Sequence, residues 1–234
     1  MTLLKICQNV AEESGFAKPS TIVSNTDKVA VRLFRAANRA GRVLAKLNWT
    51  VLQDEHTFST VASTAAYALP SDFARFNGEA QWNRTNKDRV FGPTSPEDWQ
   101  AIKSGFVTST IDDRFRVKVD SGTRKFFIDP TPSAVETIAY EYISNNWCQS
   151  SGETGQDDWA ADADTGRIDE ELLELETLWR FKLAMGLDPS VEAANAKRII
   201  EMEFARDGGL KTVRMDKSNK LRLVANIPET NVGI

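Results

Sequence analysis

AANRAGRVLAKLNWTVL, residues 36–52, is a helix-forming sequence that runs into a tryptophan, Trp49. Upstream of it, SNTDK (residues 24–28) supplies side chains that cap the starts of helices, so we predict one helix over residues 26–47. At roughly 100° per residue, one arc of this helix is apolar. The residues on that arc are Val29, Leu33, Ala36, Ala40, Val43, Leu44 and Leu47.

A second arc of the same helix is basic. One interpretation is a face that is solvated or paired with acidic groups elsewhere in the fold. The other is a docking surface for an acidic partner or for DNA phosphate. The helix carries no obvious catalytic group, so we expect it to make contacts rather than to do chemistry. The five cations of this basic stripe, at intervals of three and four residues, are Arg32, Arg35, Arg39, Arg42 and Lys46.

Three further helices are expected beside this one. Residues 2–15 have a capping threonine at their start and a glycine at their end. Residues 169–186 begin with a cluster of carboxylates and then become apolar on nearly all sides, which is typical of a central core helix. Asp188 and Pro189 then start a last helix. The residues expected to line it are Val191, Ala194, Ile199, Met202 and Ala205.

The middle of the chain changes to short segments of alternating, aromatic or β-branched residues. The clearest hairpin joins residues 114–119 to residues 124–128 through the turn DSGT. A short helix interrupts the strands, because Ser95 and Pro96 form an N-cap and first-turn pair. We therefore predict that residues 50–147 form a small antiparallel β module with one short helix.

Residues 148–167, CQSSGETGQDDWAADADTGR, are predicted to form an acidic, flexible loop with Trp159 alone at its tip. The aspartates of this loop invite comparison with a calcium-binding loop. An EF-hand that starts at Asp162 needs glycine at its sixth position, where Arg167 stands, and a carboxylate at its twelfth, where Leu173 stands. We therefore expect no metal site in this loop.

Residues 209–234 show little periodicity and mix basic with apolar side chains. They are either a loose terminus or an arm that becomes ordered on a partner. The second interpretation is favoured, because the segment is more apolar than a solvated tail needs to be. The residues of this C-terminal arm expected to bind a partner are Lys211, Val213, Arg214, Lys217, Lys220, Leu221, Arg222, Leu223, Val224 and Ile227.

The composition excludes several classes of function. A formal net charge of −4 over 234 residues does not suit a general nucleic-acid binder, so any basic function must be local. Cys7 and Cys148 form no motif, which favours unpaired thiols in a reducing cytosol. No apolar run is long enough for a membrane span. The single histidine, His56, has no nucleophile motif beside it, so we expect neither enzymatic activity nor a cofactor.

Together these elements predict an α+β fold. Residues 1–49 and 168–208 form a helical bundle core of about four helices, and residues 50–147 form the inserted antiparallel β module. The acidic loop at residues 148–167 returns the chain to the bundle, and residues 209–234 extend from it as the arm.

The order of these parts resembles that of a known family. The segments that carry the resemblance are PSTIVSNTDKVAVRLFRAANRAGRVLAKLNWTVL, then TFSTVASTAAYALPSDF, then LWRFKLAMGLD. Their order is similar to that of the head–tail connector proteins of tailed bacteriophages, which are also called adaptor or head-completion proteins and include the tail tubular protein A group. The resemblance covers about residues 1–208, and its most telling part is the helix at residues 38–42 running into Asn48 and Trp49.

This resemblance implies a non-enzymatic virion protein of the head–tail junction, made in the cytoplasm of the host bacterium. Such proteins assemble as a ring, usually of twelve subunits, beneath the portal protein. The ring extends the DNA channel without sequence-specific DNA binding and offers a surface to a downstream tail, nozzle or collar protein. The arm is then expected to reach the portal. The acidic residues expected to meet the basic stripe of a neighbour are Glu170, Glu171 and Glu174.

Two alternatives belong to other classes of protein. A nucleic-acid-binding module would use the basic stripe from Arg32 to Lys46 and would bind duplex DNA in a salt-dependent way. A non-catalytic tail component that binds glycans would instead use exposed aromatic residues, for which Trp82 and Trp159 are the candidates. A microscope image of the protein with its portal, a DNA-binding assay and a glycan screen distinguish the three.

Overall fold

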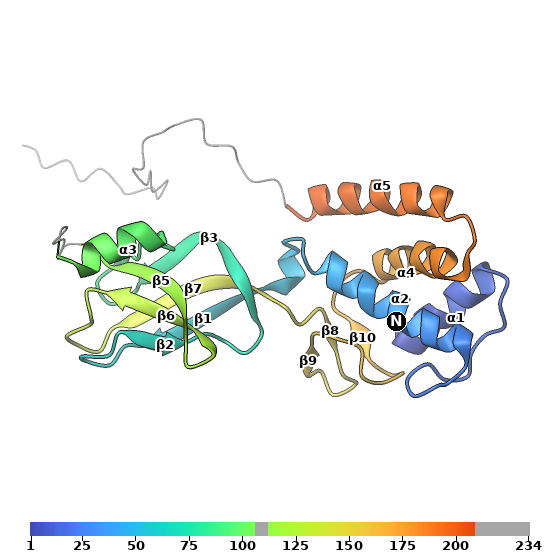
Figure 1. Cartoon of the computed structure of the whole chain (residues 1–234), viewed down its shortest axis with the longest axis horizontal. Helices are drawn as coiled ribbons and strands as arrows, with labels where there is room; N and C mark the ends of the chain where they lie inside the picture. The colour runs from blue at the N-terminus through green and yellow to red at the C-terminus, as the bar shows by residue number, and fades with distance from the viewer. Residues whose placement is uncertain (106–111, 209–234) are drawn as a thin grey trace, which may run out of the picture.

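The computed structural model describes residues 1–105 and 112–208, so the predicted C-terminal arm lies outside the described residues. The chain forms two modules that lie end to end along the long axis of the molecule (Figure 1). One is helical and holds the N-terminus, and the other is built from two antiparallel sheets. The predicted α+β class, with helices around an inserted β module, is confirmed.

Four helices form the helical module: α1 (Leu3–Glu13), α2 (Lys28–Leu44), α4 (Glu170–Met185) and α5 (Ser190–Arg206). Helix α4 is central, because it packs against each of the other three (Figure 1). Helix α2 is antiparallel to α4, and Arg32 near the start of α2 contacts Met185 at the end of α4. The last turns of α4 therefore face the first turns of α2.

Local side chains set the ends of these helices. Asp27 accepts a hydrogen bond from the backbone of Val29 at 2.9 Å, and Asp169 accepts one from Glu171 at 2.9 Å. Gly186 ends α4 in the left-handed conformation, with a φ of 81°. Helix α2 is shorter than the predicted range of residues 26–47, because Asp27 is its N-cap and tighter turns replace the helix after Leu44.

Helix α5 corrects one expectation from the sequence. Of the five residues expected to line it, Val191 is 75% exposed and Met202 is 38% exposed, and the two alanines are exposed as well. The fifth expected residue, Ile199, does pack on the core, together with Ile200 and Phe204, and Ala196 is the one fully buried residue of α5. The other four are exposed because α5 touches the bundle along a single side.

The β module contains two sheets. The first has the order β1-β7-β3-β4 and the second the order β2-β6-β5. The 3-10 helix η1 (Thr50–Leu52) leads into the module, and α3 (Pro96–Lys103) begins at the predicted Ser95 cap. The strands are β1 (Gln53–Ser59), β2 (Ala66–Ala68), β3 (Phe73–Asn83), β4 (Asp88–Arg89), β5 (Arg114–Asp120), β6 (Thr123–Asp129) and β7 (Thr137–Ser144).

Aromatic side chains fill the space between these sheets. The ring of Phe126 is stacked on Phe115 at 4.5 Å and on Tyr140 at 5.5 Å. The predicted hairpin is confirmed as β5 and β6, with Ser121 and Gly122 in its turn. Both turn residues have positive φ, which matches the twist that a two-residue hairpin requires.

The segment at residues 148–167 differs from the predicted exposed loop. It contains a small sheet of the order β10-β8-β9, formed by β8 (Cys148–Gln149), β9 (Gly155–Gln156) and β10 (Thr165–Gly166). Trp159 is not at an exposed tip, because it is only 3% exposed and lies edge-on to Trp147 at 5.0 Å between ring centroids. The prediction was wrong on this point, since a nearby tryptophan gives Trp159 an apolar site.

The acidic residues of this segment bind backbone groups. Asp164 accepts hydrogen bonds from Ala160 and Ala161, both at 2.7 Å. Asp162 accepts one from Val23 at 2.8 Å and one from Ile22 at 3.1 Å, which ties the segment to the loop after α1. Within residues 1–105 and 112–208, no three side chains of His, Cys, Asp or Glu are placed to share a metal ion.

Candidate partner-binding surface

The basic stripe runs along the outer side of α2, and its members have different surroundings. Arg35, Arg39 and Lys46 are exposed, and none of them contacts a carboxylate in the described part of the chain. Arg32 is half-buried, and its Nη1 atom lies 3.1 Å from the sulfur of Met185. The stripe therefore holds arginines whose charge the described chain does not neutralise.

Arg42 is the exception, because it pairs within the chain. Its Nε atom donates to Oδ1 of Asp158 at 2.6 Å, and Nη2 donates to the other carboxylate oxygen. This two-point contact and the charge of Asp158 raise the pKa of Arg42 above its ordinary value. The sequence interpretation of a stripe paired with acidic groups elsewhere in the fold is therefore correct for this one member.

The three acidic residues expected to meet the stripe lie in the first turns of α4. Glu170 pairs with the amino group of Met1, and Glu174 accepts a hydrogen bond from Asn9 at 3.0 Å. Glu171 is exposed, and its carboxylate has no partner among residues 1–105 and 112–208. Within the described chain no contact joins the stripe to these acids. Because α2 and α4 are antiparallel, the arginines lie beside the last turns of α4, whereas the acids lie in its first turns.

A hollow of about 410 Å³ separates the stripe from the last turns of α4. Three arginines and Ala36 of α2 line one wall, and four side chains of α4 line the other. Leu183 on that second wall is 58% exposed, although the sequence suggests that this helix is buried on nearly all sides. The eight residues that line this α2–α4 hollow are Arg32, Arg35, Ala36, Arg39, Trp179, Arg180, Leu183 and Ala184.

Glu176 holds the α4 wall in place. Its side chain is 9% exposed, and Oε2 accepts hydrogen bonds from Trp179 Nε1 at 3.0 Å and from Arg180 Nε at 2.9 Å. The guanidinium of Arg180 also lies 4.3 Å from the centre of the Trp179 ring. A nearly buried carboxylate thus fixes an aromatic and a basic side chain at the edge of the hollow before any partner arrives.

Sequence reasoning missed this half of the surface. The apolar pattern on nearly every turn of the helix at residues 169–186 predicts that Trp179 and Leu183 lie in the core. One available signal was the four-residue spacing of Glu176 and Arg180, which forms an ion pair on a single helix face. Trp179, which contacts both partners, is adjacent to Arg180 in the sequence and could have been placed beside this pair.

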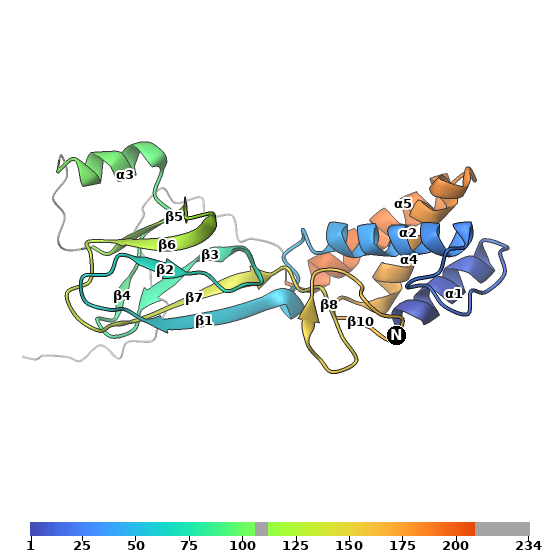
Figure 2. The same ribbon diagram turned by 60° about the horizontal axis from the view of Figure 1, so that its bottom comes forward.

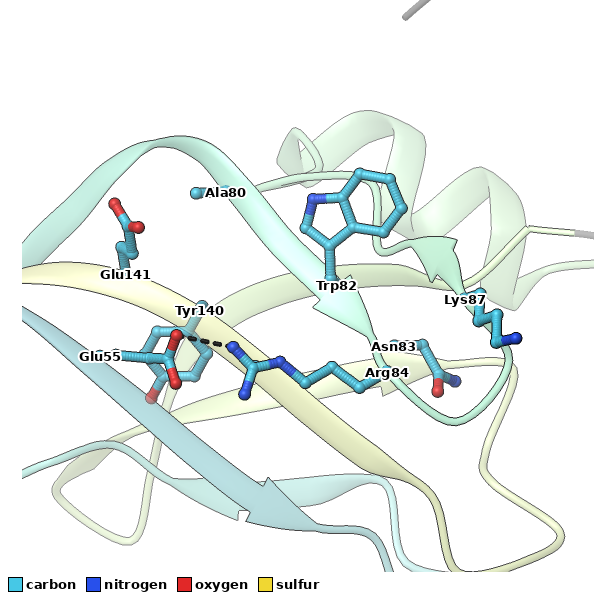
Figure 3. Close-up of a pocket in the computed structure, with 9 residues that line it drawn as sticks. Glu55, Ala80, Trp82, Asn83, Arg84, Lys87, Tyr140 and Glu141 are labelled. Atoms are coloured by element: carbon cyan, nitrogen blue, oxygen red, sulfur yellow. Dashed lines mark hydrogen bonds and ion pairs between the residues drawn. The ribbon is translucent and has the colours of Figure 1, made fainter. Parts of the chain in front are cut away.

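A second hollow, of about 460 Å³, lies on the outer face of the four-stranded sheet (Figure 3). Trp82 stands on β3 at one side of it, and Arg84 crosses the strands to pair with Glu55 at 2.6 Å. Glu141 accepts a hydrogen bond from Asn77 at 3.2 Å. Because Trp159 is buried in the other module, Trp82 is the one candidate left for the glycan-binding alternative.

The thiols and the histidine are packed in the two modules. Cys7 and Cys148 are both free, as predicted, and the structure shows that both are buried, which raises the pKa of each thiol to about 12. The ring of His56 lies 5.9 Å from that of Phe58 and 5.3 Å from that of Tyr140, and burial lowers its pKa.

None of the helices in the described ranges has the length and hydropathy to cross a membrane.

The sequence was compared with known proteins. The family model described as SU10 adaptor protein matches residues 1–221, which includes both modules and the first half of the arm. A search of curated proteins found no match. The matching family is a family of phage head–tail adaptors, so the resemblance stated from the sequence is confirmed.

Proposed function

The chain belongs to the SU10 adaptor protein family, so it is a structural adaptor of a bacteriophage, and we propose that it forms the ring that joins the portal to the tail. In this proposal copies of the chain assemble beneath the portal, with twelve as the expected number. The ring extends the DNA channel, contacts the DNA without reading its sequence and offers its far side to a tail, nozzle or collar protein. Its place is the virion, at the head–tail junction.

The observation that supports ring formation is the separation of opposite charges on one helix pair. Within the described part of the chain, Arg35 and Arg39 have no carboxylate partner and lie beside the last turns of α4, whereas Glu171 is exposed in its first turn. One chain cannot bring these groups together, but a neighbour placed head to tail can. Contacts of this heterologous type close into a ring when the rotation between neighbouring copies allows it, and each weak contact is then repeated around the ring.

The arm at residues 209–234 is proposed to bind the portal. It carries five basic side chains together with leucine, valine and isoleucine, a composition that suits an extended segment ordered by a partner. The described chain ends beside the β module, where Asp207 accepts a hydrogen bond from the backbone of Thr50 at 2.6 Å. The arm therefore starts at the junction of the two modules rather than at the far end of the helical one.

Co-purification with the portal protein of the same phage tests this assignment. The intact chain is expected to remain bound to immobilised portal, and deletion of residues 210–234 is expected to abolish binding while leaving the helical and β modules folded. The matched control keeps the arm at full length and replaces Lys211, Lys217 and Lys220 by arginine, which preserves its charge. Retention of the deleted chain at the level of the intact one would show that the portal contact lies elsewhere.

A DNA-binding module is the second candidate, and the observation that favours it is that Arg35 and Arg39 have no acidic partner within residues 1–105 and 112–208. This function predicts tight binding to duplex DNA that weakens steeply as salt is raised. The net charge of −4 opposes it. Titration of the purified protein with fluorescent duplex DNA at several salt concentrations separates this candidate from the adaptor ring.

A further inference from the structure

We propose that the α2–α4 hollow is the socket of the contact between copies, and that it receives Glu171 and the first turn of α4 from the next copy. This inference rests on the proposed ring and specifies the surfaces that form it. It adds Trp179, Arg180 and Leu183 to the contact, and it selects one of the three acidic residues as the group that enters the socket.

The composition of the hollow is that of a protein–protein contact. Trp179 and Arg180 belong to the residue types that most often dominate the energy of such contacts, and Glu176 holds both in position. Leu183 adds an apolar side chain that is 58% exposed in the single chain. DNA phosphate would use the arginines but would gain little from an exposed leucine beside a tryptophan edge, so the hollow favours a protein partner.

The charge of the hollow specifies the chemistry of that partner. Arg32, Arg35 and Arg39 line one wall, and Arg180 stands on the other. Glu176, the carboxylate that holds the α4 wall, already bonds Arg180 and is almost buried. The surface that fills the hollow must therefore bring carboxylate, because four guanidinium groups left in a closing interface would repel one another.

The chain itself carries a matching group. Glu170 is paired with the amino group of Met1 and Glu174 with Asn9, which leaves Glu171 as the exposed, unpartnered carboxylate of the three within the described ranges. Leu183 follows Glu171 by twelve residues along α4, roughly 18 Å at the rise of an α-helix. The socket and the residue that enters it (the insert, Glu171) thus lie at opposite ends of one helix, which is the arrangement that a head-to-tail contact needs.

Exchange of the two charges tests this contact. Arg39→Glu removes charge complementarity from the socket, and Glu171→Arg removes it from the insert, while both side chains are exposed in the single chain. Each variant alone is expected to lose assembly on the portal, measured as copies per portal by mass photometry. An equal mixture of the two is expected to recover assembly when the variants alternate around the ring. The reversed socket of one copy then meets the reversed residue of the next copy, and each unchanged socket meets an unchanged Glu171.

Trp179→Ala tests the apolar side of the socket. We expect self-association at least about tenfold weaker, as for an aromatic residue at the centre of an interface. Trp82→Ala is the matched control, because Trp82 is a half-buried tryptophan in the other module. Circular dichroism of both variants checks that the helices and strands remain.

The possible results separate this inference from the proposed function. Normal assembly of both charge variants, or failure of their mixture to assemble, overturns the socket while the ring itself stands. A wild-type chain that never assembles, alone or on the portal, overturns both. Loss of duplex DNA binding in Arg39→Glu, with unchanged assembly, assigns the hollow to phosphate and overturns the socket as well.

Discussion

The ring of Trp147 lies directly against Gly41, so that a Cβ atom added to that glycine would stand 2.1 Å from the ring. Gly41 lies inside α2, where glycine is an unfavourable residue, and Trp147 is the buried residue just before β8. The contact locks the helix against the segment that returns from the β module. A glycine within the AANRAGRVL helix thus permits the packing between distant parts of the chain.

Gly41→Ala tests this close approach. Helix propensity alone predicts that alanine is better by about 1 kcal/mol. The overlap with Trp147 forces the ring to move, so we expect a net loss of about 1–3 kcal/mol in the free energy of unfolding, measured with urea. Gly152→Ala is the control, because the nearest atom to its added Cβ is 3.8 Å away. A more stable Gly41→Ala variant would show that the ring has room to shift.

Arg75 is predicted to hold the two modules together. From β3 it donates to the backbone oxygen of Leu47 at 2.8 Å and of Lys46 at 3.0 Å, just after the end of α2. Arg75→Leu should therefore lower the free energy of unfolding by about 1.5–3 kcal/mol, the usual effect of losing hydrogen bonds from a charged donor. Arg84→Leu, which breaks an exposed ion pair near the same strand, should cost less than about 1 kcal/mol. Equal losses in both variants would contradict this role.

His56 makes the stability of the β module depend on pH. Burial lowers its pKa below the ordinary value of 6.5, so the unfolded chain takes up a proton at a higher pH than the folded one. The contribution of neutral His56 is complete above pH 6.5 and is lost as the pH falls toward the folded pKa. Because the chain has one histidine, an NMR titration of its ring protons reads this pKa directly. A folded-state value at or above 6.5 would be incompatible with the packing described.

The two buried thiols are expected to be unreactive in the folded protein. Burial raises the pKa of Cys7 and of Cys148 to about 12, so at pH 8 almost no thiolate is present. A colorimetric thiol reagent should react with neither cysteine in buffer and with both in concentrated urea. Rapid labelling of the native chain would show that α1 or the β8 segment opens readily.

Features that depend on short sequence patterns were predictable. The Ser95 cap of α3, the Asp169 region that begins α4, and the Ser121–Gly122 hairpin turn all follow from a few adjacent residues. The basic stripe on α2 was predictable for the same reason, because helical periodicity alone determines which side chains share a face.

Features that depend on distant contacts were not. Trp159 looks exposed in a polar loop until Trp147 is placed beside it, and Gly41 has no visible role until the same ring is present. The α2–α4 hollow was not predicted, because an apolar pattern indicates that a helix is covered but not by what. The same pattern would arise if residues of the same chain or of another copy packed against it. Sequence could therefore identify the arginines of the surface but not Trp179, which completes it.

Negative-stain microscopy of the protein mixed with the portal protein of the same phage is the most direct test of the adaptor assignment. With the intact chain we expect class averages in which a second ring is stacked on the portal and shares its axis. With the chain deleted from residue 210 we expect this second ring to be absent. Portal particles that remain bare at a saturating concentration of the intact protein would contradict the proposed ring.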